Sequence, residues 1–194
     1  HYIGEVGAPT RTRKLFDYLS GGKLEWAPMD DEYDRFYVGD RIFNAIAGKR
    51  EFRDNLVRQF PNEAHAIDRY IALLDRSGDA LSAFGMGRGM PQWMGKAIKP
   101  WLNWKRRGAY RQTTWNVLSK LTDDKDLIAT LCGQWGDMGM PPKRSPFFMH
   151  AMIVRHYLHG GYYPVGCASR MAETIIPVIQ RGGGEVFTYA SVEK

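Results

Sequence analysis

The sequence predicts an α+β fold that is mainly helical and has a small antiparallel sheet near its start. Apolar residues recur at spacings of three and four along most of the chain, which is typical of amphipathic helices. Short aromatic and β-branched runs in residues 24–48 favour strands. Residues 169–192 suggest a helix, a glycine turn and a strand, which is half of a βαβ unit. We therefore expect a helical body followed by a segment that joins a second layer.

Local signals predict the elements of the helical body. Residues 10–22 predict a short helix that begins at Thr10 or Thr12 and ends at a glycine pair. Residues 34–48 predict a hairpin with its turn at Gly39, and the run before it belongs to the same small sheet. Further helices are expected at 50–60, 63–84, 91–105, 113–121, 123–135 and 145–161.

The composition is that of an ordinary single-domain globular protein. The 194 residues are 44% hydrophobic, which is enough to bury one core without disulfides or metals. No run reaches the roughly 18 to 20 uncharged apolar residues that cross a bilayer. Cys132 and Cys167 are far apart and outside a CxxC spacing, so we expect neither a disulfide framework nor a thiolate metal site. A reducing, cytoplasmic location fits these observations best.

One segment places basic residues beside tryptophans. The net charge of +6 suits an anionic partner, but no nucleic-acid-binding signature accompanies it. In residues 91–107, tryptophans recur at helical spacing among lysines and arginines, as in helices that lie at a membrane surface. A core helix with a basic outer face is the alternative, which Pro100 favours because it interrupts an amphipathic helix. The membrane-facing candidates are Trp93, Trp101, Trp104, Lys96 and Lys99.

Other motifs indicate structure more than chemistry. The run FGMGRGM at 84–90 lacks the G-x-G-x-x-G spacing and follows a helical segment, so we interpret it as a flexible loop. His150, His156 and His159 lie on or beside one helix without further metal ligands, which favours surface or capping histidines. No metal site is predicted, and no acid–base residue stands out as catalytic.

The C-terminal third carries a family resemblance. It contains in order a proline-rich turn, an SPF helix start, the passage GGYYPVG at 160–166, an apolar helix and a final GG-x-V run. This order resembles the phytoene dehydrogenase-related flavoproteins, especially the branch of all-trans-retinol saturase and carotenoid isomerases. HYIG at 1–4 and LEWAPMDDEYDRF at 24–36 are similar to earlier passages of that family. The likeness covers nearly the whole chain but only an internal part of the family protein.

The resemblance implies an FAD-dependent oxidoreductase that saturates, desaturates or isomerises C=C bonds of a lipophilic polyene or isoprenoid. FAD is the implied cofactor, with NAD(P)H as a candidate reductant. The implied organisation is a substrate-binding domain at 1–159, which carries a short remnant of the FAD domain at 1–8. Residues 160–194 then form a return segment into a Rossmann-like FAD domain. We expect the isolated chain to be inactive.

The resemblance also implies site residues. Tyr163, Pro164 and Gly166 are expected near the flavin, and the backbone at Val192 near its adenine end. Cys167 stands where the family has a second glycine, so it departs from the pattern beside the same cofactor. Thioethers and aromatics, which adapt to lipophilic ligands, supply the substrate-pocket candidates, each of which suits simple core packing equally well. These are Met138, Met140, Phe147, Phe148, Met149 and Tyr162.

Functions from other classes stay open beside the oxidoreductase. A standalone peripheral-membrane or lipid-binding module would use the Trp/Lys segment 91–107. A nucleic-acid binder would use the net positive charge, and steeply salt-dependent DNA retention would identify it.

Overall fold

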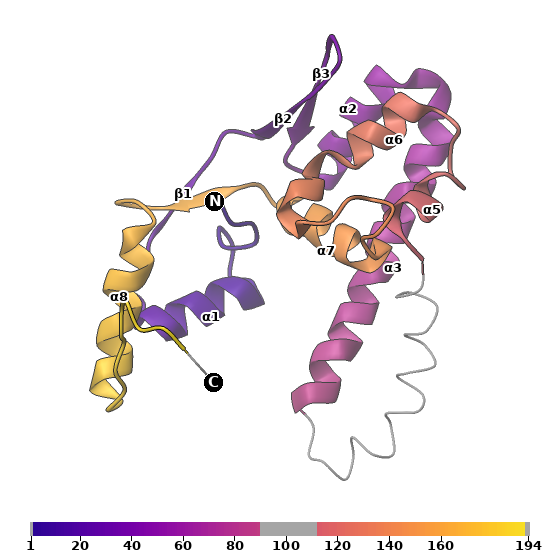
Figure 1. The fold of residues 1–194 in the computed structure, drawn as a ribbon. Coiled ribbons are helices and arrows are strands. Elements are labelled where there is room, and N and C mark those ends of the chain that lie inside the picture. The colour runs from indigo at the N-terminus through magenta and orange to yellow at the C-terminus, as the bar shows by residue number, and fades with distance from the viewer. Residues whose placement is uncertain (1, 90–111, 193–194) are drawn as a thin grey trace. The chain divides into compact units, whose positions relative to one another are not determined.

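The computed structural model describes residues 2–89 and 112–192, with side chains described through residue 77 in the helix that ends at 89 (Figure 1). About half of the chain is helical, and two small antiparallel sheets accompany the helices, which confirms the predicted α+β class. The chain divides into two compact units, residues 1–31 with 159–194 and residues 32–158. The assignment of substrate binding and FAD binding to separate parts of the chain stays a prediction.

The first unit contains two helices that pack against each other. Helix α1 spans Arg11–Ser20, and helix α8 spans Ser169–Arg181. The hydroxyl oxygen of Thr10 accepts a hydrogen bond from the Arg13 N–H at 3.1 Å and caps α1. Gly21 ends α1 with a φ of +62°. The predicted start and end of this helix are therefore confirmed.

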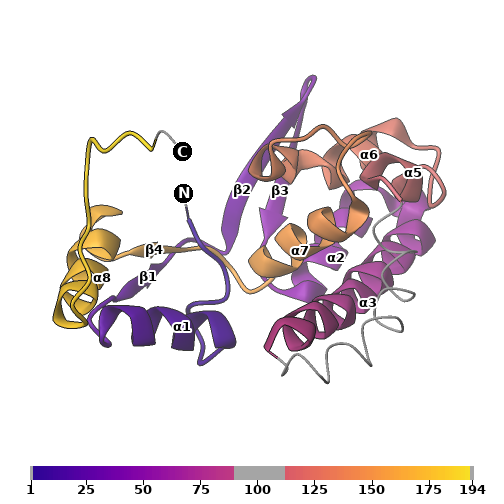
Figure 2. The ribbon, with the colours of Figure 1, turned by 60° about the horizontal axis from the view of Figure 1, so that its bottom comes forward.

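The sheet of the first unit joins segments that are far apart in the sequence. Strand β1, Trp26–Pro28, pairs antiparallel with β4, Tyr162–Pro164, and Figure 2 shows the two side by side. Ile3 adds a bridge to β4 through two backbone hydrogen bonds with Tyr162, of 2.9 and 2.8 Å. This pairing corrects the prediction that the run before the hairpin shares the hairpin's sheet, because its partner is the GGYYP passage.

The segment after α8 does not form the predicted terminal strand. Residues 182–192 are irregular, although the helix and glycine turn before them are confirmed. A strand needs a neighbour to pair with its backbone N–H and C=O groups, and no strand among the described residues lies along this segment. Its large apolar side chains are exposed, namely Val186, Phe187, Tyr189 and Val192.

The second unit combines a hairpin with a group of helices. Strand β2, Glu32–Val38, pairs with β3, Arg41–Ile46, around the turn predicted at Gly39. The helices lie where the apolar periodicity predicts them. They are α2 (Lys49–Gln59), the 3-10 turn η1 (Pro61–Glu63), α3 (Ala64–Gly89), α5 (Thr114–Leu118), α6 (Lys125–Leu131), the 3-10 helix η2 (Gly133–Met138) and α7 (Phe147–Tyr157).

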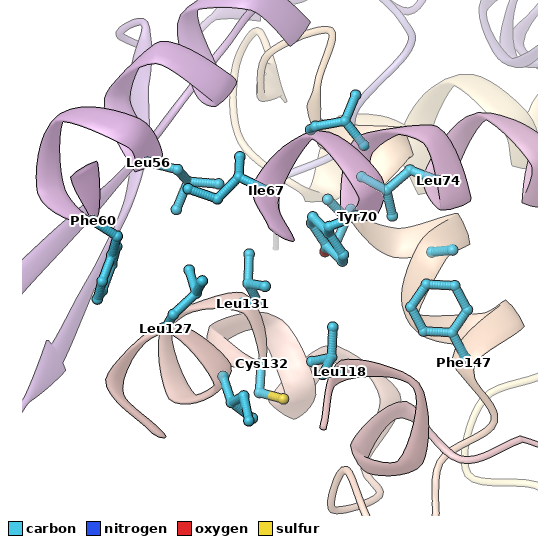
Figure 3. Close-up of a cluster of buried hydrophobic side chains, with 14 of the residues drawn as sticks. Leu56, Phe60, Ile67, Tyr70, Leu74, Leu118, Leu127, Leu131, Cys132 and Phe147 are labelled. Carbon is cyan, nitrogen blue, oxygen red and sulfur yellow. The ribbon is translucent and has the colours of Figure 1, made fainter. Parts of the chain in front are cut away.

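One buried cluster holds the second unit together (Figure 3). On α3, Ile67, Tyr70 and Leu74 are spaced by three and four residues, and each is at most 1% exposed. Leu127 and Leu131 of α6 belong to the same cluster, and Figure 3 shows them on the opposite side of it. Helix α3 also packs along α7, so α3 is the central element of this unit.

Two sequence predictions concern the region around the end of α3. The helix continues through residues 84–89, so the interpretation of FGMGRGM as a flexible loop is wrong. Once the packed first half of α3 has nucleated the helix, further turns add readily, even though each glycine costs about 1 kcal/mol relative to alanine. The membrane-facing candidates Trp93, Lys96, Lys99, Trp101 and Trp104 lie outside the described residues. Among the helices that the structure describes, none is both long enough and apolar enough to cross a membrane.

Candidate functional site

Four of the residues assigned to the flavin lie at the end of strand β4 and in the turn that follows it. Strand β4 ends at Pro164, which is buried, and residues 165–168 lead directly into α8. Tyr163 is 37% exposed. Gly166 and Cys167 are both exposed and have φ values of +84° and +79°. The turn therefore presents its backbone to solvent beside an aromatic ring.

Position 166 favours glycine for two reasons, its backbone conformation and the little room for a side chain. Its positive φ disfavours any side chain, and a Cβ built at this position lies 3.0 Å from Cγ of Arg170. Cys167 adopts a similar φ without being glycine. The departure from the family pattern at residue 167 thus places a side chain in the left-handed region.

We expect Cys167→Gly to stabilise the first unit by about 0.5 to 1 kcal/mol. A side chain in the left-handed region costs roughly 1 to 2 kcal/mol, and the greater freedom of glycine in the unfolded chain offsets part of that gain. Cys167→Ala is the control, because it removes the thiol but keeps the Cβ. Thermal unfolding of the three proteins measures the effect, and equal midpoints for the glycine and alanine variants would contradict it.

The start of helix α8 beside this turn favours ligand atoms that accept hydrogen bonds or carry negative charge. Helix α8 begins directly after the turn, and its N-cap residue, Ala168, provides no side-chain cap. The N-terminal end of a helix carries a positive partial charge. Val192, which was assigned to the adenine end of FAD, is 90% exposed in the irregular tail and lies outside this turn.

The second unit contains a cavity of about 320 Å³ between α3, the turn after α5 and the first turn of α7. This volume falls within the range of roughly 300 to 1,000 Å³ that is usual for small-molecule sites. On α3 the lining residues are Arg69, Leu73, Arg76 and Ser77, whose spacing places them on one face of the helix. The other lining residues are Gln112, Val117, Lys120, Leu121, Phe147 and Phe148.

Buried hydrogen bonds fix the wall of the cavity that lies opposite α3. The hydroxyl groups of Thr114 and Ser145 are fully buried and 2.9 Å apart, and the Thr114 N–H donates to the Ser145 carbonyl oxygen at 2.9 Å. The Phe147 N–H donates to the Gln112 carbonyl oxygen, also at 2.9 Å. These bonds connect the start of α5 to the start of α7, and they hold Phe147 and Phe148 in place at the cavity.

The structure brings together two of the six predicted pocket residues. Phe147 and Phe148 are 7% and 5% exposed and line the cavity. Met149 follows them on α7 but is 39% exposed, and it is not among the lining residues. The others lie elsewhere, since Met138 ends η2, Met140 follows it and Tyr162 belongs to β4 of the first unit. The pocket roles of these residues stay predictions.

Sequence reasoning missed the face of α3 that lines the cavity. Arg69, Leu73 and Arg76 recur at helical spacing, but basic residues on an amphipathic helix usually form its solvated face. The one sequence signal for a lining role was Leu73, an apolar residue that lies between the two arginines on that face. Both arginines are exposed, so this face is solvated and lines the cavity at the same time.

Tyr70 of α3 and His150 of α7 form a buried hydrogen-bonded pair. The Tyr70 hydroxyl lies 2.8 Å from Nε2 of His150, and the two residues are 0% and 1% exposed. Burial lowers the pKa of His150 to about 4 and raises the pKa of Tyr70. The prediction of a surface or capping histidine is therefore wrong for His150, because a polar partner from α3 allows its burial.

A second, smaller cavity lies elsewhere in the second unit. A cavity of about 20 Å³ between the hairpin, α2 and α3 has room for about one water molecule. Buried side-chain atoms of Asn44, Gln59 and Gln134, which line it, lack hydrogen-bond partners in the described parts of the chain. Within those same parts, no three histidine, cysteine, aspartate or glutamate side chains group as metal ligands.

Comparison with known proteins shows which class of protein the chain is similar to. No protein-family model matches the chain, and no solved structure matches it. Curated proteins that match along its whole length include several that are named as reductases, which are oxidoreductases.

More closely, the chain is homologous to a segment of the all-trans-retinol 13,14-reductases, which confirms the predicted resemblance. It is 32% identical over 203 residues to the protein of this name from Danio rerio and 31% identical over 206 residues to that from Homo sapiens. A protein from Danio rerio named as an inactive all-trans-retinol 13,14-reductase is 24% identical over 207 residues. Each alignment covers 100% of this chain and 33% of the relative, so the chain spans about a third of the length of these proteins.

Proposed function

We propose that this chain is part of an FAD-dependent oxidoreductase that acts on C=C bonds of a lipophilic polyene or isoprenoid. The observation that carries the proposal is the similarity, along the whole chain, to proteins named all-trans-retinol 13,14-reductases. Retinol is a conjugated polyene, and the names specify reduction at one of its bonds. Because one relative is named inactive, turnover is the deciding measurement.

The turn between β4 and α8 suits contact with one side of a flavin. Tyr163 offers a ring, Gly166 allows close approach of the backbone, and the positive end of α8 follows. When bound, FAD supplies the hydride chemistry, and the protein supplies orientation and a dry site. The glycines at 85, 87 and 89 lie inside α3, so they do not form the strand-to-helix turn that binds a diphosphate. We therefore expect the turn between β4 and α8 to contact only part of the cofactor.

The apolar wall of the second unit supports a lipophilic ligand. Phe147 and Phe148 are buried aromatic side chains at a cavity of small-molecule size. Peripheral contact with a membrane is part of this proposal, because the Trp/Lys segment 91–107 has the composition that suits a bilayer surface from which such a substrate is taken.

Production of the full-length protein from the reading frame that contains this sequence tests the proposal. We expect the full-length protein to retain flavin absorbance through gel filtration and to shorten the conjugation of all-trans-retinol in the presence of a reductant, which a shift of its absorption spectrum reports. We expect the isolated 194-residue chain to retain little or no flavin. A full-length protein that takes up no FAD on reconstitution, or that binds FAD but changes no polyene or isoprenoid substrate, would overturn the proposal.

A pair of matched variants of the full-length protein locates the contact with FAD. Gly166→Ala places a Cβ at a φ of +84° in the turn, whereas Gly139→Ala does so at +64° where nothing lies within 4 Å. Both changes introduce left-handed strain, but only the first alters the candidate flavin surface. Loss of bound flavin in Gly166→Ala alone is the expected outcome. Equal flavin content in the two variants would remove this turn from the cofactor site.

A further inference from the structure

We propose that the 320 Å³ cavity of the second unit binds a single-chain anionic lipid, with its hydrocarbon chain against the apolar wall and its carboxylate beside Arg69 and Arg76. This inference goes beyond the oxidoreductase proposal, because the ligand is charged and the relatives are named for retinol, a neutral alcohol. Binding of such a lipid does not require FAD or turnover, because the cavity lies within the second unit, which has its own buried core.

The apolar half of the cavity suits a hydrocarbon chain. Phe147 and Phe148 are nearly fully buried, so their rings are held by the core and form a rigid surface. Leu73, Val117 and Leu121 are partly buried and pack against the same core, which leaves part of each side chain available. A lipid chain that covers the exposed parts of Leu73, Val117 and Leu121 removes apolar area from water, at about 25 cal/mol per Å².

The polar half of the cavity is cationic. Arg69 and Arg76 are seven residues apart on α3, about 10 Å along the helix axis, with Leu73 between them. Lys120 contributes a third positive charge from the turn after α5, and its Nζ lies 3.5 Å from the side-chain oxygen of Gln112. None of the lining residues in the described parts of the chain is acidic. This arrangement is complementary to one negatively charged head group.

Two acidic residues of α3 are engaged on α2 rather than on these arginines. Asp68 precedes Arg69, but it bonds to Arg53 of α2 at 2.6 Å. Asp75 precedes Arg76, but it bonds to Lys49 of α2 at 2.5 Å.

Arg69 and Arg76 themselves have no ion-pair partner within the residues that the structure describes. The N-terminal end of α7, at Phe147, adds a positive partial charge on the same side of the unit. Among the side chains that the structure describes, the two arginines of the lining are therefore left for an anionic ligand.

Fluorescence titration of the 194-residue chain with cis-parinaric acid, a conjugated C18 carboxylic acid, tests the proposal. We expect saturable binding of this probe and its displacement by oleate. Oleyl alcohol is expected to displace the probe about tenfold less well, because only the acid carries a negative charge. Oleyl phosphate is the second anionic probe, and its tighter binding would assign a phosphate head group within the same anionic class. Binding is also expected to weaken between 0.1 and 1 M salt, as the Debye length falls from about 10 to 3 Å.

Two double variants with the same change in net charge separate the cavity from the rest of the surface. Arg69→Gln with Arg76→Gln removes cations of the lining, whereas Arg50→Gln with Arg58→Gln removes exposed cations of α2 that are not part of it. A single exposed ion pair contributes little to affinity, so both lining arginines are replaced together. We expect about a tenfold rise in the Kd for oleate in this double variant and no such rise in the α2 double variant. Equal affinity of the two double variants, or equal displacement by acid and alcohol, would overturn the proposal.

Discussion

Replacement of Leu127 by alanine is expected to lower the free energy of unfolding by about 3 kcal/mol. Leu127 is 0% exposed in the cluster of the second unit, where Figure 3 shows it pointing toward the side chains that α2 and α3 contribute. Truncation of a buried leucine removes apolar contacts and leaves a cavity, which together cost about 2 to 5 kcal/mol. Urea unfolding followed by circular dichroism measures the change.

Ile42→Ala is the matched control for Leu127→Ala. Ile42 lies on β3 of the same unit, opposite Tyr37, and both side chains are more than half exposed. We expect this substitution to cost less than about 1 kcal/mol, because it loses only part of a cross-strand contact on a solvated face. A similar loss of stability in the two variants would show that the cluster does not hold the second unit together.

The helices of the second unit could be predicted because their signals are local. Apolar residues at spacings of three and four indicate a helix wherever one face packs against a core, and α2, α3, α6 and α7 all follow this rule. The sheet of the first unit could not be predicted in the same way. Its strands, 26–28 and 162–164, are three residues each, and nothing in either run identifies the other as its partner. Long-range pairing of this kind depends on the tertiary fold.

The lining of the cavity combines residues that sequence signals single out with residues that they do not, for a related reason. Phe147 and Phe148 stood out as aromatic side chains in a segment with a family resemblance. Arg69 and Arg76 did not, because a basic residue on a helix has the same sequence signature whether it faces water or a cavity. His150 is the opposite case, because the sequence favoured a surface or capping histidine and the structure buries it. Its burial depends on Tyr70, which lies 80 residues earlier, so no local pattern identifies it as a core residue.

The stability of the second unit is expected to fall by about 3 kcal/mol as the pH decreases from 6.5 to 4. The pKa of His150 is about 4 in the folded chain, against 6.5 for an ordinary histidine. Between these values the unfolded chain binds a proton that the folded chain does not, so acid favours unfolding. One pKa unit corresponds to about 1.4 kcal/mol, which gives the expected magnitude. The contribution is fully present above pH 6.5 and is lost as the pH falls.

Among the described residues, the groups that face His150 carry no charge that would offset this effect. The Tyr70 hydroxyl has a raised pKa, and burial raises the pKa of the Cys132 thiol of the same cluster to about 12, so both groups are neutral across this range. The ring of Phe147, with its centroid 5.7 Å from that of His150, is apolar. Desolvation of the imidazolium is therefore the dominant cause of the pH dependence.

His150→Gln tests this cause, because a glutamine amide can still hydrogen-bond to the Tyr70 hydroxyl but does not ionise. Urea titrations at pH 7, 5.5 and 4 are expected to show a flatter dependence for this variant than for the unchanged protein. His65→Gln is the control, since His65 is an exposed histidine on the same helix as Tyr70. If His150→Gln loses as much stability on acidification as the unchanged protein, then ionisation of another group must open the core, and the Tyr70–His150 pair contributes only packing.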